Sequence, residues 1–136
     1  MSSNMDWLSK VESMVSNVYK NDMFNYLKAV IYNTDNKDLI EKKEKAFNAL
    51  FIGIEAMNQN NYDKAINLVQ NSIDIFKETQ DQLRQSFSEF FMGQIYQTKE
   101  EFEKAKEYYK RSYQYLKEQK NNFALTIEEK LKELEK

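Results

Sequence analysis

The sequence predicts an all-α protein of the α-solenoid class, with about seven helices stacked as antiparallel pairs and ending in a C-terminal capping helix. The first observation is internal repetition, because a shift of forty residues places Phe47 on Phe87 and Ser72 on Ser112. A period of about 20–50 residues indicates supersecondary units that stack on their neighbours. The second is composition: the chain has no proline and two glycines, so its turns are expected to use Asn, Asp and Thr.

The two glycines, Gly53 and Gly93, are equivalent in the repeat. Each lies inside a stretch that otherwise reads as helix, where glycine costs about 1 kcal/mol relative to alanine. The helical pattern continues through both positions, so turn formation does not explain them. We therefore expect close approach of a second helix, with Ala65 and Ala105 as its small partners. The alternative is that both glycines are merely tolerated in an ordinary helix bundle.

Residues 5–33 are expected to form an N-terminal helical hairpin. Apolar residues recur there at helical spacing on both sides of an interruption at Asn21-Asp22. Two interpretations stay open: a divergent repeat with larger residues at the helix crossing, or an unrelated hairpin that caps the solenoid.

Residues 37–79 are the first helix-pair unit. Thr34 or Asp35 is expected to cap its first helix, which runs to about Asn58. The second helix is expected over residues 62–79.

Residues 82–119 are the second unit. Asp81 is expected to cap a helix over residues 82–97, and Thr98 with Glu101 to form a capping box ahead of a helix over 100–118. Residues 122–136 then form a terminal helix which, by register, is a third first helix without its partner. It matches the polar end cap that solenoids require, and the prediction is one domain over residues 1–136.

Units 46–79 and 86–119 resemble tetratricopeptide repeats, which are antiparallel helix pairs stacked into a right-handed superhelix. Residues at the family's signature positions are Gly53, Tyr62, Ala65, Gly93, Tyr96, Phe102, Ala105 and Tyr109. The leading tryptophan and the closing proline are absent. The period of forty exceeds the family's usual period of about thirty-four, which resembles its long-helix variants.

The composition argues against an enzyme. Histidine and cysteine are absent, which removes the commonest general base and sulfur-based metal ligation. No glycine-rich phosphate loop exists because the two glycines are forty residues apart. Carboxylate pairs such as Glu100-Glu101 and Glu128-Glu129 read as exposed helix surface. We expect no catalytic residue, no metal site and no cofactor.

Charge and hydropathy restrict the kinds of partner and the location expected for the chain. A net charge of −2 argues against a nucleic-acid or anionic-membrane surface. The tyrosines of residues 108–115 could form a stacking platform for single-stranded nucleic acid, but core packing is favoured because Tyr109 matches a family packing position. No apolar run approaches the roughly 20 residues needed to span a bilayer, and the first residues lack a basic signal-peptide region. The expected location is the cytoplasm.

The resemblance implies a concave groove, lined by the first helix of each pair, that holds an extended peptide or a helix. Carrying the groove positions across gives Phe47, Leu50, Ile54, Asn58, Phe87, Phe90, Gln94, Gln97, Ile127 and Lys130. The amides among them would bond a peptide backbone and the apolar residues would bury its side chains. The alternative is that the phenylalanines belong to the core.

The first functional hypothesis is therefore a non-catalytic adaptor that binds a peptide or helix of another protein. Leu50 and Phe90 replace the basic clamp of the subclass that grips a C-terminal carboxylate, which disfavours that ligand. Three alternatives are a small secretion-type or assembly chaperone, a peptide-sensing regulator, and a scaffold that forms a homodimer.

Overall fold

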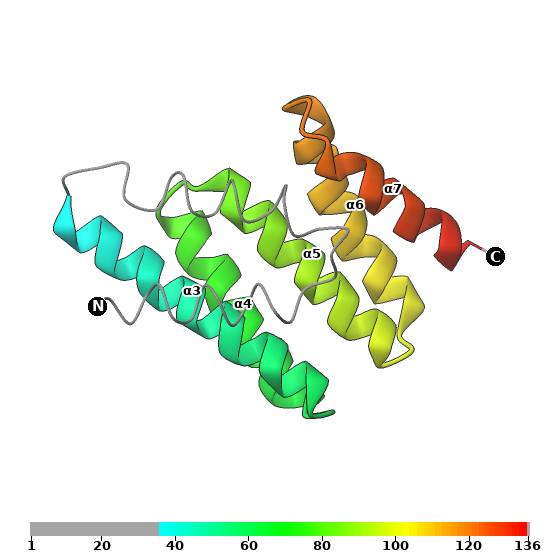
Figure 1. Ribbon diagram of the computed structural model, residues 1–136, viewed down its shortest axis with the longest axis horizontal. Helices are drawn as coiled ribbons and strands as arrows, with labels where there is room; N and C mark the ends of the chain where they lie inside the picture. The colour runs from blue at the N-terminus through cyan, green and yellow to red at the C-terminus, as the bar shows by residue number, and fades with distance from the viewer. Residues whose placement is uncertain (1–35, 136) are drawn as a thin grey trace.

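The computed structural model describes residues 36–135, where all regular secondary structure is helical. The helices, labelled in Figure 1, are α3 (Lys37–Asn58), α4 (Tyr62–Glu78), α5 (Gln82–Thr98), α6 (Phe102–Glu118) and α7 (Phe123–Leu134). The hairpin expected over residues 5–33 lies outside the described residues. The described part of the chain therefore holds five of the expected seven helices.

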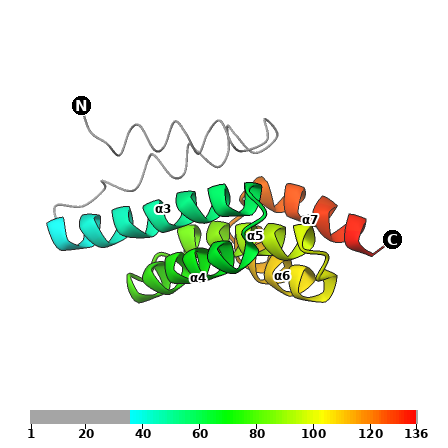
Figure 2. The same ribbon diagram turned by 90° about the horizontal axis from the view of Figure 1, so that it is seen from below.

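Successive helices are packed neighbours along the whole series from α3 to α7. Figure 2 shows α3 and α7 on one side of the molecule and α4 and α6 on the other. Both units expected from the repeat are therefore present as helix pairs, α3 with α4 and α5 with α6, and α7 follows them as the last helix.

Four turns of the same design join the helices. Each contains one residue in the left-handed region, at Asn60, Gln80, Glu100 and Lys120, with φ between 55° and 66°. In each turn the following N–H donates to a carbonyl five residues back; for example, the Asp81 N–H donates to the Phe76 carbonyl at 2.8 Å. This is the Schellman arrangement, which usually uses glycine at the left-handed position. The expectation of Asn, Asp and Thr in the turns misses three of these residues.

Side-chain caps fix where three of the helices begin, and in α4 the Oδ1 of Asn61 accepts from the Lys64 N–H at 3.4 Å. Asp81 caps α5 as expected, since its Oδ1 accepts from the Arg84 N–H at 3.2 Å. The expected cap of α3 is wrong: Asn36 takes this role, and its Oδ1 accepts from the Leu39 N–H at 3.1 Å.

The capping box expected ahead of α6 is also wrong. Thr98 is the last residue of α5, and its hydroxyl donates back to the Gln94 carbonyl at 2.9 Å. Glu101 is the N-cap residue of α6 but makes no side-chain capping bond. The three-residue turn keeps Thr98 inside the preceding helix, where its hydroxyl finds a carbonyl of its own helix.

The core is centred on α5, where every residue from Ser86 to Gly93 is buried. Phe90 packs edge-on against Phe91 and Phe123, with ring centroids 5.6 and 4.9 Å away, and lies 5.5 Å from the ring of Tyr109. A helix that is buried around its whole circumference must have neighbours on every side. Helices α4, α6 and α7 supply such neighbours.

Both glycines lie at close helix crossings. A Cβ built at Gly53 would lie 2.8 Å from Cγ2 of Val69, and one at Gly93 would lie 2.6 Å from two ring carbons of Tyr109. The expected close approach is therefore present. The nearest side chains, however, lie four residues beyond the expected partners Ala65 and Ala105, which are themselves fully buried.

Among residues 36–135, no helix combines the length and the apolar character that a bilayer span requires.

Candidate interaction surfaces

The apolar positions carried over from the resemblance are core residues in this structure. Their exposed fractions do not exceed 3 %, and they are Phe47, Leu50, Ile54, Phe87, Phe90 and Ile127. In the described structure these side chains offer almost no surface to a ligand. The alternative interpretation, in which the phenylalanines belong to the core, agrees with this burial.

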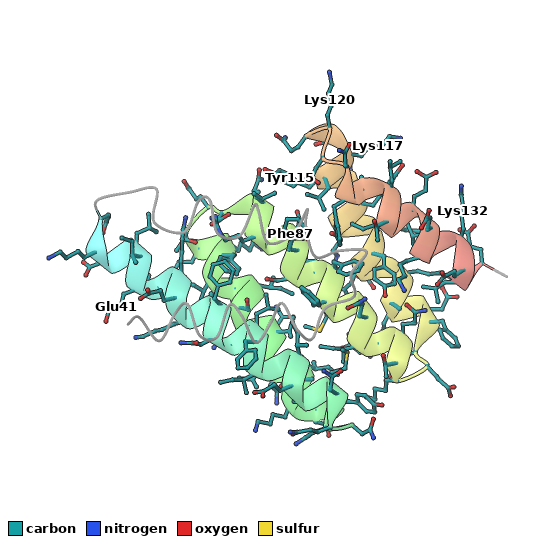
Figure 3. The ribbon with its side chains drawn as sticks, in the orientation of Figure 1. Glu41, Phe87, Tyr115, Lys117, Lys120 and Lys132 are labelled. Atoms are coloured by element: carbon teal, nitrogen blue, oxygen red, sulfur yellow. The ribbon has the colours of Figure 1, made fainter. Side chains whose placement is uncertain are left out.

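Terminal helix α7 covers part of the expected groove. The ring of Phe123 lies 5.1 Å from that of Phe87 and 4.9 Å from that of Phe90, and Phe123 is itself fully buried. Figure 3 labels Phe87 near the middle of the described structure, on α5. The protein's own last helix therefore supplies contacts to these phenylalanines.

The four polar positions of the same set remain at least partly accessible. Asn58 is exposed at the end of α3, and Gln94, Gln97 and Lys130 are half-buried. The Gln97 side chain is already used inside the fold, because its Oε1 accepts from the Tyr109 hydroxyl at 2.7 Å. Asn58, Gln94 and Lys130 are thus the polar positions of the expected groove whose side chains no described internal hydrogen bond occupies.

The aromatic signature residues have different environments. Tyr62 and Tyr96 are half-buried against the core, and Tyr96 stacks on Tyr108 with a centroid distance of 5.7 Å. Tyr109 is fully buried, so its assignment to the core is confirmed. Phe102 is 46 % exposed and does not take part in the core as the family pattern implied. It is the first residue of α6.

A polar groove that the sequence did not predict lies between α5 and α6. It encloses about 310 Å³ and is lined by Gln82, Gln85, Ser86, Glu89, Arg111, Gln114, Tyr115 and Glu118. On both helices these positions follow the spacing i, i+3, i+4, i+7, which marks one face of a helix. A comparison of the two repeats could have indicated this groove, because the residue types on this helix face differ between them.

Small buried side chains hold the two helices together beside this groove. The Ser112 hydroxyl donates to the Ser86 carbonyl at 2.7 Å, and both serines are buried. Longer side chains, among them the half-buried Tyr115 labelled on α6 in Figure 3, form the walls. The hollow therefore combines a close helix contact with long polar residues around it.

Glu89 is the buried charged residue among those that line this groove. It is 8 % exposed, and burial raises the pKa of its carboxyl group, which a hydrogen bond from Gln85 and the charges of Arg111 and Lys77 only partly oppose. Arg111 is engaged elsewhere: its guanidinium pairs with Glu107 and lies 4.8 Å from the Tyr108 ring centroid. The carboxylate of Glu89 is therefore incompletely compensated.

A second buried charged cluster joins α3 to the start of α5. Asp81 Oδ2 lies 3.0 Å from Lys43 Nζ and also pairs with the Arg84 guanidinium. Arg84 is 1 % exposed, and its side chain lies over the Phe47 ring at 5.8 Å. Because all three charged groups are withdrawn from water, we assign this cluster a role in fixing the two units together.

Metal coordination has no candidate in residues 36–135, where acidic residues do not gather in groups suited to an ion.

A comparison with protein-family models matches residues 46–118 to the tetratricopeptide repeat. The match covers more than half of the chain and runs from within α3 to the end of α6, so the chain belongs to the tetratricopeptide repeat family. Repeats of this family generally mediate protein–protein interaction and are non-catalytic. No curated protein and no solved structure matches the chain.

Proposed function

We propose that this chain is a non-catalytic interaction module that binds a peptide or a helix of a partner protein. The observation that carries the proposal is the pair of stacked helical units, built on residues that match the tetratricopeptide repeat. Stacked repeats of this kind create extended surfaces that neighbouring units share, and these surfaces suit binding of another polypeptide.

The proposed contact surface follows the first helices of the units, α3 and α5, and continues onto α7. Because the apolar positions of this face are buried, its polar side chains carry the recognition. Asn58 and Gln94 have amides that can pair with a peptide backbone, and Lys130 has a cation for a partner's acidic group. The proposed interface is therefore more polar than the groove first expected.

The test is an affinity pull-down from native extract that compares the parent protein with the variant Asn58→Asp/Gln94→Glu/Lys130→Glu. The matched control, Asn67→Glu/Asn71→Glu, places charges on exposed positions of the second helix α4. Circular dichroism and thermal melting establish that all three proteins are folded before the experiment.

We expect a partner protein that the parent and the control retain and that the first variant loses. Retention by all three would move the binding surface away from this face. Failure of the parent to retain any protein, together with a dimeric mass, would replace the proposal with self-association. No specific observation in residues 36–135 favours the chaperone or the peptide-sensing regulator over the general interaction module.

A further inference from the structure

The two repeats carry different charged residues at the positions that line the groove between α5 and α6 in the second unit. A shift of forty residues relates the α5 positions to Lys42, Lys45, Ala46 and Ala49 on α3. The same shift relates the α6 positions to Asn71, Asp74, Ile75 and Glu78 on α4. The first unit thus has two lysines and two carboxylates at these positions, so its charges balance.

In the first unit one of these lysines closes the end of the helix pair. Lys42 Nζ lies 3.4 Å from Glu78 Oε1, which joins the beginning of α3 to the end of α4. In the second unit Gln82 stands in place of Lys42, whereas the carboxylate is kept as Glu118. No lysine or arginine of residues 36–135 forms a salt bridge with Glu118.

The other end of the second groove gains a carboxylate that the first unit lacks. Glu89 replaces Ala49, and in the described part of the chain it also lacks a salt bridge. Seven residues separate Gln82 from Glu89, so the acidic ends of the groove lie about 10 Å apart along the helix axis. Two carboxylates thus line the hollow, and Arg111, which replaces Asn71, is the one cation among the lining residues.

The cations of this region offset the two carboxylates only in part. Arg111 pairs with Glu107 and packs on Tyr108, while Lys117 lies 5.5 Å from the Tyr113 ring centroid on the neighbouring face of α6. Lys77 acts on Glu89 from α4, but its charge does not offset the burial that raises the Glu89 pKa. The lining residues therefore keep one net negative charge, from Glu89 and Glu118 against Arg111, whereas the equivalent residues of the first unit are balanced.

We propose that the groove between α5 and α6 is a binding site for lysine or arginine side chains of a partner polypeptide, held between Glu89 and Glu118. Gln85 and Gln114 supply amides for the accompanying backbone, and Tyr115 supplies an aromatic wall suited to a cation. The volume of about 310 Å³ lies at the lower end of the range for ligand sites, which suits one or two side chains. This inference goes beyond the proposed function, because it concerns a different surface and specifies the partner's charge.

The test is an NMR titration of the ¹⁵N-labelled full chain with the peptide acetyl-Lys-Gly-Gly-Lys-Gly-amide. The same peptide with both lysines acetylated is the control probe, because acetylation removes the charge and keeps the length. We expect the charged peptide alone to shift the side-chain amide signals of Gln82, Gln85 and Gln114. We also expect it to lower the pKa of Glu89, measured by the ¹³C shift of its carboxyl carbon.

Two variants separate this site from general attraction to an acidic protein. Gln82→Lys/Gln85→Lys gives the second groove the lysines of the first, and we expect it to weaken peptide binding at least about tenfold, since an internal cation then occupies the place. Its control, Gln59→Lys/Asn67→Lys, adds the same charge at exposed positions of the first unit and should change the Kd less than about twofold. Thermal melting checks that each variant is folded.

Equal weakening by both lysine variants, or peptide shifts spread over all acidic surfaces, would overturn the proposal. So would equal binding of the acetylated peptide. A positive titration does not depend on the polar surface of α3, α5 and α7, so the two proposals fail independently.

Discussion

At Gly53 and Gly93 a single carbon atom decides whether two helices can meet. The space at Gly93 is filled by the ring of Tyr109, which is fully buried and tied to Gln97 by its hydroxyl. The space at Gly53 is filled by a methyl group of Val69 and by the backbone oxygen of Ala65 at 3.3 Å. In both cases the packing contacts that this close approach allows offset the low helix propensity of glycine.

We predict that Gly93→Ala destabilises the fold by about 1–3 kcal/mol, because the added methyl group overlaps a ring that cannot move without losing its hydrogen bond. Gly53→Ala should destabilise less, since one side-chain methyl group is a smaller obstacle than a held ring. The free energy of unfolding in urea measures both effects. Asn48→Ala, at an exposed position of α3, is the control for propensity alone. A gain in stability for Gly93→Ala equal to that of Asn48→Ala would contradict the steric explanation.

The sequence predicted the close crossing at both glycines and one neighbour, Ala65, whose backbone oxygen lies at the first crossing, but not the side chains of Val69 and Tyr109. Equivalent positions and a continuous helical pattern were enough to indicate a close crossing. The identity of the partner side chains depends on how the second helix is rotated, which composition and spacing do not specify. The same limit applies to Phe47 and Phe90, where the family pattern indicates which face a residue occupies but not whether another helix covers that face.

At the scale of the element, the helix ends are unusual because residues other than glycine adopt the left-handed conformation there. Gln80, Glu100 and Lys120 adopt left-handed conformations that cost an L-residue roughly 1–2 kcal/mol. Asn60 tolerates this conformation better, and its Oδ1 also accepts from the Tyr62 hydroxyl at 3.0 Å. The sequence suggested turns at these places, but it gave no sign that Gln, Glu and Lys would take the left-handed position.

We predict that Gln80→Gly or Glu100→Gly stabilises the protein by about 0.5–1 kcal/mol, because glycine relieves the left-handed strain at the helix end. Asn60→Gly is the matched variant and should gain less, since it also loses a hydrogen bond. Melting temperature and urea unfolding report the change. A lower stability of both Gln80→Gly and Glu100→Gly would show that these side chains contribute more than their backbone strain costs.

At the scale of the whole molecule, α7 completes the core that two helix pairs leave open. Phe123 and Ile127 are fully buried, whereas Leu125 on the same helix is 65 % exposed. The terminal helix was predicted from its register as a first helix without its partner, and the structure places its buried face on the second unit. The electrostatic difference between the two helix pairs, by contrast, lies in residues that differ between the repeats, so the shared pattern did not predict it.

We predict that Phe123→Ala destabilises the protein by about 3–5 kcal/mol, because it removes a ring that contacts both Phe87 and Phe90. Leu125→Ala should change stability by less than about 0.5 kcal/mol, as expected for an exposed position. Removing residues 122–136 should expose the same phenylalanines and promote aggregation. Urea unfolding and light scattering measure these effects, and a truncated chain as stable and soluble as the parent would show that α7 is not a structural cap.

The four left-handed turn residues, Asn60, Gln80, Glu100 and Lys120, stand twenty positions apart along the chain. Each of the three intervals comprises one helix of seventeen residues and three turn residues, and only the connection from α6 to α7 is longer, with four residues. A duplicated segment of forty residues, inserted at one of these turns, would therefore add one helix pair and leave the following helix in its original direction. Whole copies of the repeat can therefore be added to the length of the molecule while each new helix keeps the packing of its predecessor.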